Sequence, residues 1–405
     1  MQRAAPSIVR RPGLSILIAI TAVGPLALNI FIPSMPGLQR VFATDYATVQ
    51  LALSLYLIGV AVAQLFYGPL SDRYGRRPVL LAGMSLCLLG SIACLLAPTI
   101  EALIAGRVLQ AVGACSGLVL SRAIIRDLYD RAQAASRIGY VMTAMVVAPM
   151  IAPTIGGILD VRFGWQASFL LLAVAAGLVL AASAALLHET NPVRGKMQRP
   201  SDMVVGFARL LRMRAFNGYA WQGAFSSAVF FSFLGGAPYV MMEILDRSPE
   251  EYGLYFASLS LMYMFGNFLS GRFSVRVGSD RMIWYGVTLG VVGTGLLTGL
   301  ALADLISPLA LFGSMSIVSV GNGLSLPNGM AGAVSVDPGL AGAASGLAGF
   351  LQMGLGASLS FVASALLDQS ATPLVALMLL AAICALITHA LLRPDREHPG
   401  SRAAT

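Results

Sequence analysis

Charged residues gather between Gly68 and Arg77, in a segment that separates two apolar stretches. They are Asp72, Arg73, Arg76 and Arg77. The arginines suit the orientation signal of a membrane protein, but an aspartate has no use in such a signal. We therefore interpret the segment as a latch, in which Asp72 meets the positive N-terminal end of a facing helix and Arg76 pairs with Asp127. In the alternative interpretation, the arginines only set the orientation.

One arginine, Arg107, lies inside an apolar stretch, and Gln110 follows three residues later on nearly the same face of a helix. A charge in the bilayer costs about 2.5–3.5 kcal/mol on insertion scales, which makes this residue a functional candidate. We expect Arg107 to bind an anionic or carbonyl group of a substrate, or to respond to proton movement. The alternative is that its side chain extends to the nearby membrane surface.

Polar and aromatic side chains in other apolar stretches could line a binding cavity, because amides are costly when they face lipid. The candidates for substrate contact are Asn29, Arg107, Gln110, Tyr239, Asn322 and Gln352. Further residues of this kind are Tyr56, Gln64, Gln222, Phe230, Phe231, Tyr263, Asn267 and Asn328. The four cysteines form no C-x-x-C pair, and the apolar stretches contain no cluster of metal ligands, so neither a metal nor a cofactor is expected.

The elements that must hold these residues are membrane-spanning helices. Of the 405 residues, 57% are hydrophobic and 11% are charged, and the mean hydropathy is +0.79. Soluble domains carry roughly 25% charged residues, and disordered chains are poor in apolar residues. These values exclude both classes and predict an all-α integral membrane protein. The net charge of +8 does not favour nucleic acid as a partner, since the basic residues stand in short clusters between apolar stretches.

Twelve apolar stretches are each long enough to be a transmembrane helix. They cover residues 13–37, 47–69, 78–97, 101–122, 138–160, 165–187, 215–243, 252–271, 282–303, 307–335, 341–367 and 372–392. If both termini are cytoplasmic, nearly all of the 26 Lys and Arg residues fall on the cytoplasmic side. The exceptions are Arg40, Arg107, Arg162 and Arg247. This bias supports both the number of spans and the orientation.

The charged segment recurs after almost half of the chain. The matching residues are Gly68 with Gly271, Ser71 with Ser274, Arg73 with Arg276 and Gly75 with Gly278. The repeat predicts two six-helix halves related by pseudo-twofold symmetry, 1–187 and 215–392, with a cytoplasmic linker at 188–214 and a cytoplasmic tail at 393–405. Transporters built from such repeats bind substrate between the halves near the membrane midplane. The site needs no second copy, so we expect a functional monomer.

The charged segment GPLSDRYGRRP resembles the signature loop of the major facilitator superfamily, and RVLQAVG from Arg107 resembles its second signature. A run similar to the antiporter signature of drug exporters contains Pro149, Pro153, Gly156 and Gly157. Four further runs resemble the bicyclomycin and chloramphenicol resistance (Bcr/CflA) drug:proton antiporters. These are PLALNIFIPSMPGL from Pro25, IIRDLY from Ile124, FLGGAPYV from Phe233 and AGAASGLAGFLQM from Ala341.

The resemblance, which covers about 14–392, implies roles for these residues. The latch of Asp72, Arg73, Arg76 and Asp127 would hold the two halves in the outward-facing state. The prolines and glycines of the antiporter-like run would bend a helix and close a route for ion leakage. The implied protein is a secondary active transporter that exports drug-like molecules across the bacterial inner membrane, by alternating access and proton antiport.

Asn29 departs from the Bcr/CflA pattern, which commonly has an acid at this position. Asparagine does not titrate, and no Asp or Glu lies deep in the expected spans. Proton antiport therefore needs another carrier, for which Glu243 and Asp127 are the nearest candidates, or another ion. The alternative for each acid is a charge at a solvated helix end, which we favour for Glu243. A cationic drug would find no counter-ion at the midplane, so we expect neutral or anionic substrates.

A facilitator or importer of a small metabolite on the same fold is the alternative function, which the missing acid allows. A membrane enzyme or receptor would need a catalytic polar cluster or an added soluble domain, and the sequence offers neither. We therefore expect no enzymatic activity. The expected partners are a small-molecule substrate, a proton gradient and the lipid bilayer.

Overall fold

The computed structural model describes residues 13–129, 131–191, 200–367 and 370–392, and the regular elements within these ranges are all helical. Up to the linker they are α1 (Leu14–Asn29), the 3₁₀ turn η1 (Ile32–Ser34), α2 (Met35–Phe42), α3 (Tyr46–Tyr74), α4 (Arg76–Leu95), α5 (Ile100–Leu128), α6 (Arg131–Phe163) and α7 (Gln166–Leu186). From the linker onward they are α8 (Pro200–Arg212), α9 (Arg214–Tyr239), the π-helical turn η2 (Val240–Ile244), α10 (Pro249–Val277), α11 (Ser279–Leu302), α12 (Pro308–Ser335), the 3₁₀ turn η3 (Pro338–Leu340), α13 (Ala341–Ala365) and α14 (Thr372–Leu392).

Each expected span after the first coincides with a long helix, but the helices and the apolar stretches differ in length. Within the described residues, ten helices are long and apolar enough to cross a membrane, and α6 and α10 are not among them. The count of twelve spans therefore stays a prediction. Several helices continue past the apolar residues, as α3 does to Tyr74 and α10 to Val277. A helix can extend beyond the hydrocarbon because its backbone hydrogen bonds are internal.

The first apolar stretch is a broken helix. The α-helical part ends at Asn29, and η1 separates it from α2. Pro33 and Pro36 lie at this break, and each lacks the N–H that an unbroken helix would need. Phe31 and Ile32 are buried at the same place, so the break lies inside the bundle and not at its surface.

Four α-helices have side-chain N-caps in the part of the chain that the structure describes. All four of these helices begin at the end of the molecule that the charge pattern predicts to be outer. Asp45 accepts a hydrogen bond from the Thr48 amide, and Thr99 accepts one from the Ala102 amide. Ser248 and Ser307 cap α10 and α12 in the same way. Each cap satisfies a backbone N–H that has no partner inside its helix.

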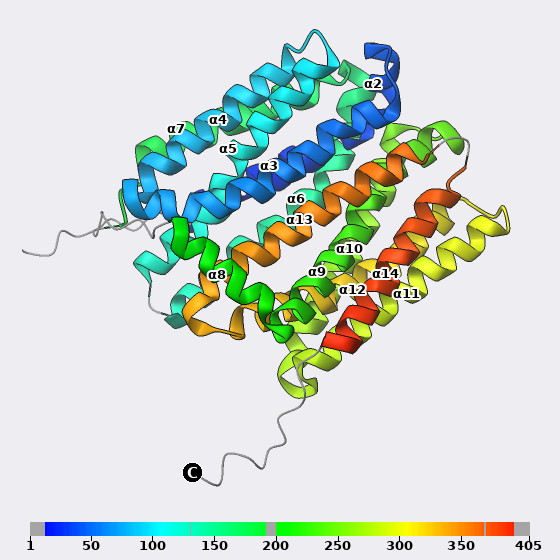
Figure 1. Cartoon of the computed structure of the whole chain (residues 1–405). Coiled ribbons are helices and arrows are strands. Elements are labelled where there is room, and N and C mark those ends of the chain that lie inside the picture. Colours follow the sequence, from blue (N-terminus) through cyan, green and yellow to red (C-terminus); the bar gives the residue numbers. More distant parts are fainter. Residues whose placement is uncertain (1–12, 130, 192–199, 368–369, 393–405) are drawn as a thin grey trace, which may run out of the picture.

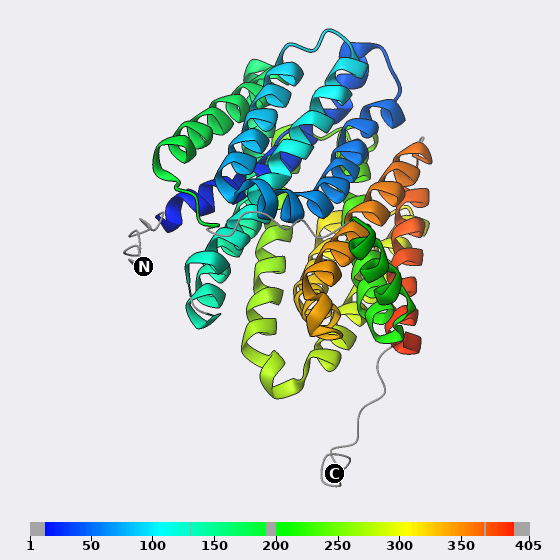
Figure 2. The same cartoon turned by 60° about the vertical axis from the view of Figure 1, so that its left-hand side comes forward.

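The helices form two groups, α1–α7 and α9–α14, which Figures 1 and 2 show in blue to green and in green to red. In the first group α4 packs on α5 and α7, and in the second α11 packs on α12 and α14. The two groups meet where α3 contacts α13 and where α6 contacts α10. Small residues permit the close approach of the helices. A β-carbon at Gly90 or Gly113 would overlap backbone atoms of the facing helix, for example.

The linker contains a helix that the apolar pattern of the sequence does not predict. This helix, α8, lies across α9 and α13 at the predicted cytoplasmic end (Figure 1). Leu210 is buried against Phe216 and Leu347, while Arg209 is exposed and pairs with Asp337 at 3.0 Å. An apolar face against the bundle and basic residues on the other face are typical of an amphipathic surface helix.

Candidate functional site

Tyr46 of α3 joins the two helix groups at the predicted outer end. Its hydroxyl donates to the carbonyl of Gly235 on α9 over 2.6 Å, and its ring centroid lies 4.9 Å from that of Tyr239. One turn further along α3, Gln50 Nε2 donates to the hydroxyl of Ser360 on α13 over 2.7 Å. Polar contacts therefore hold α3 against both α9 and α13 at this end.

The antiporter-like run lies in the second contact between the groups, where α6 meets α10. Thr154 Oγ1 donates to the Gly253 carbonyl over 2.9 Å. A β-carbon at Gly157 would overlap the Pro249 carbonyl of the opposite group, and one at Gly156 would overlap the Ile30 carbonyl at the break of the first span. Pro149 and Pro153 lie within α6 itself. The glycines thus occupy places where α6 approaches other backbones closely, whereas the proposed bend and seal stay predictions.

Arg107 is fully buried within the first group, with 0% of its surface exposed. Its Nη1 donates to the Ala27 carbonyl over 2.7 Å and to Gln110 Oε1 over 2.5 Å. The central guanidinium carbon lies 4.1 Å from the ring centroid of Phe31 and 4.2 Å from that of Tyr56. Aromatic faces stabilise a cation through the ring quadrupole. This burial contradicts the alternative in which the side chain extends to the membrane surface.

The surroundings of Arg107 hold its charge without a carboxylate. Of the residues that the structure describes, no acid forms an ion pair with it. Gln110 Nε2 continues the network by donating to Ser91 Oγ over 2.8 Å, so the amide bridges α5 and α4. Carbonyls, an amide and two aromatic rings therefore replace part of the hydration of this cation. Its Nη2 is buried and has no hydrogen-bond partner among the described residues.

Asn29, at the end of α1, is 2% exposed. Its Nδ2 donates to the Pro25 carbonyl over 2.8 Å, and its Oδ1 has no hydrogen-bond partner among the described residues. Asparagine therefore leaves one buried acceptor available at the break of the first span.

A second polar group lies along α9. Gln222 Nε2 donates to Ser226 Oγ over 2.9 Å, and Asn322 Nδ2 donates to the Ser226 carbonyl over 3.4 Å. The amide of Gln352 faces Gly223, where a β-carbon would lie 2.8 Å from Gln352 Nε2. Gln222 Oε1 is buried and has no hydrogen-bond partner among the described residues. This cluster therefore brings Asn322 and Gln352 to one helix of the second group.

The six residues expected to contact substrate thus fall into separate places. Arg107 and Gln110 are enclosed in the first group, and Asn29 lies at the break of the first span. Tyr239 lies at the outer contact with Tyr46, and Asn322 and Gln352 flank α9. A hollow of about 520 Å³ lies elsewhere, between α10 and α12 at the predicted outer end. It is lined by Arg247, Glu251, Leu254, Tyr255, Ser258, Ser307, Pro308 and Leu309. This hollow contains none of the expected substrate residues.

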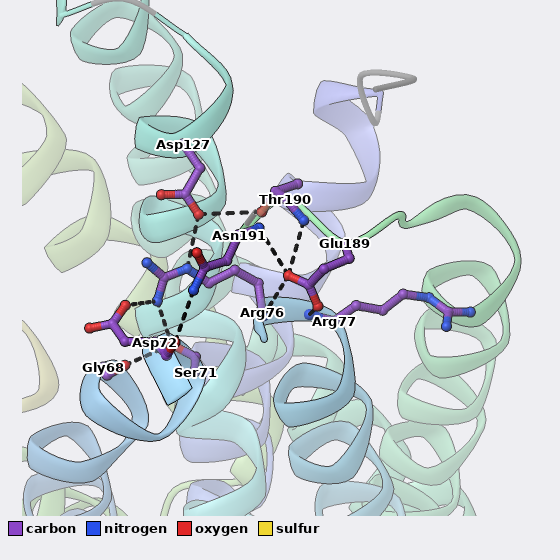
Figure 3. A network of polar contacts seen from close by, with 9 residues as sticks. All are labelled: Gly68, Ser71, Asp72, Arg76, Arg77, Asp127, Glu189, Thr190 and Asn191. Carbon is purple, nitrogen blue, oxygen red and sulfur yellow. Dashed lines mark hydrogen bonds and ion pairs between the residues drawn. The ribbon is translucent and has the colours of Figure 1, made fainter. Parts of the chain in front are cut away.

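The charged segment forms a network at the predicted cytoplasmic end, drawn in Figure 3. Arg76 pairs with Asp72 at 2.5 Å and with Asp127 at 2.9 Å. It also donates to Ser71 Oγ over 2.6 Å. The Asp72 side chain is 53% exposed, and its ion pair lies within the first group of helices. Arg73 lies over the ring of Tyr74 at 5.0 Å. The expected contact of Asp72 with a facing helix stays a prediction, because the structure pairs this carboxylate with Arg76.

Three residues that the sequence analysis does not single out belong to this network. Glu189, Thr190 and Asn191 follow α7 at the start of the linker, and all three contact the charged segment or Asp127 (Figure 3). One signal in the sequence points to these residues. Glu189 is an acid that directly follows an apolar stretch on the side rich in basic residues.

No group of three or more His, Cys, Asp or Glu residues in the described ranges could hold a metal ion. The polar groups of the site are amides, hydroxyls and carbonyls on helices, with charges mainly at the helix ends. Such an arrangement can bind and release a small molecule by hydrogen bonds.

Comparison with known proteins gives a consistent family match. The model of the Major Facilitator Superfamily matches residues 17–361 and 238–404. An uncharacterized MFS-type transporter of Bacillus subtilis, YdgK, is 32% identical over 93% of this chain and 94% of its own length. Multidrug resistance protein D of Escherichia coli is 31% identical over 88% of this chain and 89% of its own length. A chloramphenicol resistance protein of Pseudomonas aeruginosa is 30% identical over 77% of this chain and 72% of its own length.

The solved structures give the same fold. The xylose transporter XylE from E. coli, in a partially occluded inward open conformation, superposes with a TM-score of 0.74. The match covers 95% of this chain and 98% of XylE, at 12% sequence identity. At this identity the likeness concerns the fold alone.

Proposed function

We propose that this chain, which belongs to the Major Facilitator Superfamily, exports small organic molecules, antibiotics among them, across the bacterial inner membrane. The observation that carries the proposal is the similarity to Multidrug resistance protein D over almost the whole of both chains. The similarity to a chloramphenicol resistance protein supports antibiotics as one class of cargo. Proteins of this family are transporters, so the site binds and releases a substrate and does not transform it.

The two ends of the molecule differ in the polar contacts between the helix groups, and alternating access accounts for this difference. Tyr46, Gln50 and Thr154 make polar contacts between the two helix groups at the predicted outer end. At the other end, the pairs Arg76–Asp127 and Tyr219–Asp280 each lie within one group. This pattern supports a state that is closed on the outside. In the opposite state, the latch of Asp72, Arg73, Arg76 and Asp127 would close the cytoplasmic end.

The buried amides of the two helix groups suit a neutral substrate, because they offer hydrogen bonds and no charge. We place substrate contact on Asn29, Asn322 and Gln352, with Gln222 beside them, because Asn29 and Gln222 keep buried acceptors without partners. Arg107 is covered by aromatic rings and carbonyls, so its role in this proposal is to hold the first span against α5, with Gln110 as its support. Tyr239 belongs to the outer contact.

Proton antiport is the proposed driving mechanism, and Glu243 and Asp127 are the candidate carriers. Glu243 lies 4.0 Å from Arg40 at the predicted outer end, where one-third of its side chain is exposed. Asp127 pairs with Arg76 at the opposite end. A facilitator or importer is the second candidate function, favoured by the absence of a titratable group at Asn29.

The test is chloramphenicol accumulation in bacterial cells that lack their own exporters and contain this chain. We expect the chain to lower accumulation, and a proton uncoupler to abolish the difference. Everted vesicles should accumulate the drug when acidified inside and lose it when the gradient collapses. The matched control is the Arg107→Ala variant at equal membrane abundance.

Faster drug entry into starved cells without a pH gradient would favour the facilitator instead. An equal accumulation with and without the chain, for chloramphenicol and for a panel of neutral antibiotics, would contradict the export proposal.

A further inference from the structure

Glu189 uses its carboxylate to bind backbone amides at the start of α4. Its Oε1 accepts from the Arg76 amide over 2.9 Å, and Oε2 accepts from the Arg77 amide over 3.3 Å. Oε1 also accepts from the amides of Thr190 and Asn191, each over 3.0 Å. Figure 3 shows this carboxylate between the α3–α4 turn and the linker. One side chain therefore binds two segments that are far apart in the sequence.

The first turn of α4 needs such an acceptor from outside. The first amides of a helix have no partner within it, and the residue before α4 is Gly75, which has no side chain to cap them. The first turn of α4 contains no acid of its own. Glu189 supplies a negative charge at the positive end of the helix, where charge-assisted hydrogen bonds are strong.

Gly75 is suited to this arrangement in two ways. Its φ of +103° is a backbone conformation that favours glycine. A β-carbon at Gly75 would also overlap the Glu189 carboxylate. The matching residue of the second half, Gly278, has a similar φ of +93°, but a β-carbon there would meet nothing within 4 Å. The two repeats thus share the turn, and among the described residues only the first repeat has a carboxylate against its glycine.

The next two linker residues contact the acidic members of the latch. Thr190 is buried, and its hydroxyl donates to Asp127 Oδ2 over 3.3 Å. Asn191 Nδ2 donates to the backbone carbonyl of Asp72 over 3.0 Å. Residues 189–191, which we name the linker clasp, therefore touch the start of α4, the end of α5 and the end of α3.

We propose that Glu189 is a positioning residue of the latch and that the linker clasp ties the connection between the two halves to it. Glu189 fixes the backbone of Arg76, and this places the guanidinium within reach of both Asp72 and Asp127. The sequence continues from the clasp directly into the linker and α8, which packs on the second half. The linker clasp is thus joined along the chain to a helix that packs on the second half, and in this proposal a movement of the second half changes the contacts of the clasp. This inference rests on the proposed transport function.

Transport kinetics test the positioning role. Glu189→Ala should lower the maximal rate of chloramphenicol export by roughly tenfold, as expected for the loss of a charged hydrogen-bond acceptor. The KM should change by less than about twofold, because Glu189 lies away from the proposed substrate contacts. Glu189→Gln should retain part of the rate, since its amide oxygen still accepts one set of bonds. His188→Ala, a change at the exposed neighbour, is the control and should transport normally.

The two glycines give a matched pair that isolates the carboxylate contact. Gly75→Ala and Gly278→Ala strain the backbone alike, but Gly75→Ala also displaces Glu189. We expect the larger loss of rate for Gly75→Ala. In the Glu189→Ala background, Gly75→Ala should add only the small loss that Gly278→Ala causes alone. Equal losses for the two single glycine variants would overturn the proposal.

A readout without substrate separates this inference from the export proposal. The linker sequence has trypsin sites after Arg194 and Lys196. If the clasp holds the start of the linker, Glu189→Ala should speed cleavage at Arg194 several-fold, whereas His188→Ala and Gly278→Ala should match the wild type. Should Glu189→Ala fail to give a monodisperse protein, the same comparison with Glu189→Gln decides. Cleavage at the wild-type rate in the Glu189 variants contradicts the clasp, even if the chain exports no drug tested.

Discussion

The guanidinium of Arg107 lies over the ring of Phe31, and its central carbon is 4.1 Å from the ring centroid. Phe31 is at the break of the first span, and Arg107 also binds the Ala27 carbonyl just before that break. Arg107 thus fastens the broken span to α5. Its place in the fold argues for a role in the shape of the site and not for direct contact with substrate.

Arg107→Ala should therefore lower stability and maximal rate together. Loss of a buried side chain of this size costs about 2–5 kcal/mol, and we expect a lower melting temperature in detergent. The KM should change little, because residues of the first helix group enclose the guanidinium. Arg107→Lys should recover only part of the activity, since lysine lacks the planar fork that stacks on the rings. A large rise in KM at unchanged stability would instead assign Arg107 to substrate binding.

Asp72→Asn should separate transport from folding. The Asp72 side chain is 53% exposed, and exposed ion pairs contribute at most about 1 kcal/mol, so the melting temperature should hardly change. Transport should fall by up to roughly fivefold, corresponding to a shift of up to about 1 kcal/mol in the equilibrium between the two states. Asp337→Asn removes another ion pair at the same end and is the control. Full transport by Asp72→Asn would contradict the latch and would mean that the charged segment only sets the orientation of the chain in the membrane.

The sequence predicts the membrane helices well, because hydropathy and the positions of basic residues act locally along the chain. The family resemblance is confirmed by the match over residues 17–361. The linker helix α8 is missed, since a short amphipathic helix among basic residues has no strong hydropathy signal. The packing of aromatic rings over Arg107 could not be predicted either, because Phe31 and Tyr56 lie in two other spans. Glu189 escapes notice because its partners are backbone amides, which any sequence provides.

The hydrogen bond from Tyr46 to Gly235 should stabilise the state that is closed at the outer end. Tyr46→Phe removes the hydroxyl but keeps the ring against Tyr239, and the loss of one hydrogen bond is worth about 0.5–1.5 kcal/mol. The outward-open population should therefore rise by roughly two- to tenfold. Labelling of a cysteine that replaces Ser232, a buried residue one turn before Gly235 on α9, by an impermeant reagent from outside measures this population.

Tyr252→Phe is the matched control for that experiment. The Tyr252 hydroxyl is buried and has no hydrogen-bond partner among the described residues, so its removal should leave the labelling rate unchanged. The same increase in both variants would mean that a general loosening, and not the bond to Gly235, controls the outer end.

Asp45 at the start of α3 should give a pH-dependent contribution to stability. The hydrogen bond from the Thr48 amide lowers the pKa of the Asp45 carboxyl below its ordinary value. A lowered pKa means that the cap contributes fully above the ordinary value of 3.8 and is lost as the pH falls through the folded-state value. Asp45→Ala should cost about 1 kcal/mol at neutral pH, and Asp45→Asn should cost less without this acid dependence. Melting curves between pH 3 and pH 7 compare the three proteins, and a parallel pH dependence in all of them would contradict the assignment.

The charge of the preferred substrate should follow from Asn29. Its Oδ1 is a buried acceptor without a partner in the described part of the chain, and it carries no charge. A lipophilic cation would therefore be bound without a counter-ion, which is costly in a low dielectric. We expect efflux of neutral chloramphenicol to exceed that of a permanently charged dye.

Asn29→Asp should shift preference toward the dye and make transport depend on pH, since a carboxylate titrates and an amide does not. Asn29→Ser, which removes the amide without adding charge, is the control. Strong wild-type efflux of the dye, unchanged in Asn29→Asp, would place the counter-ion elsewhere, and Glu243 is then the first residue to replace.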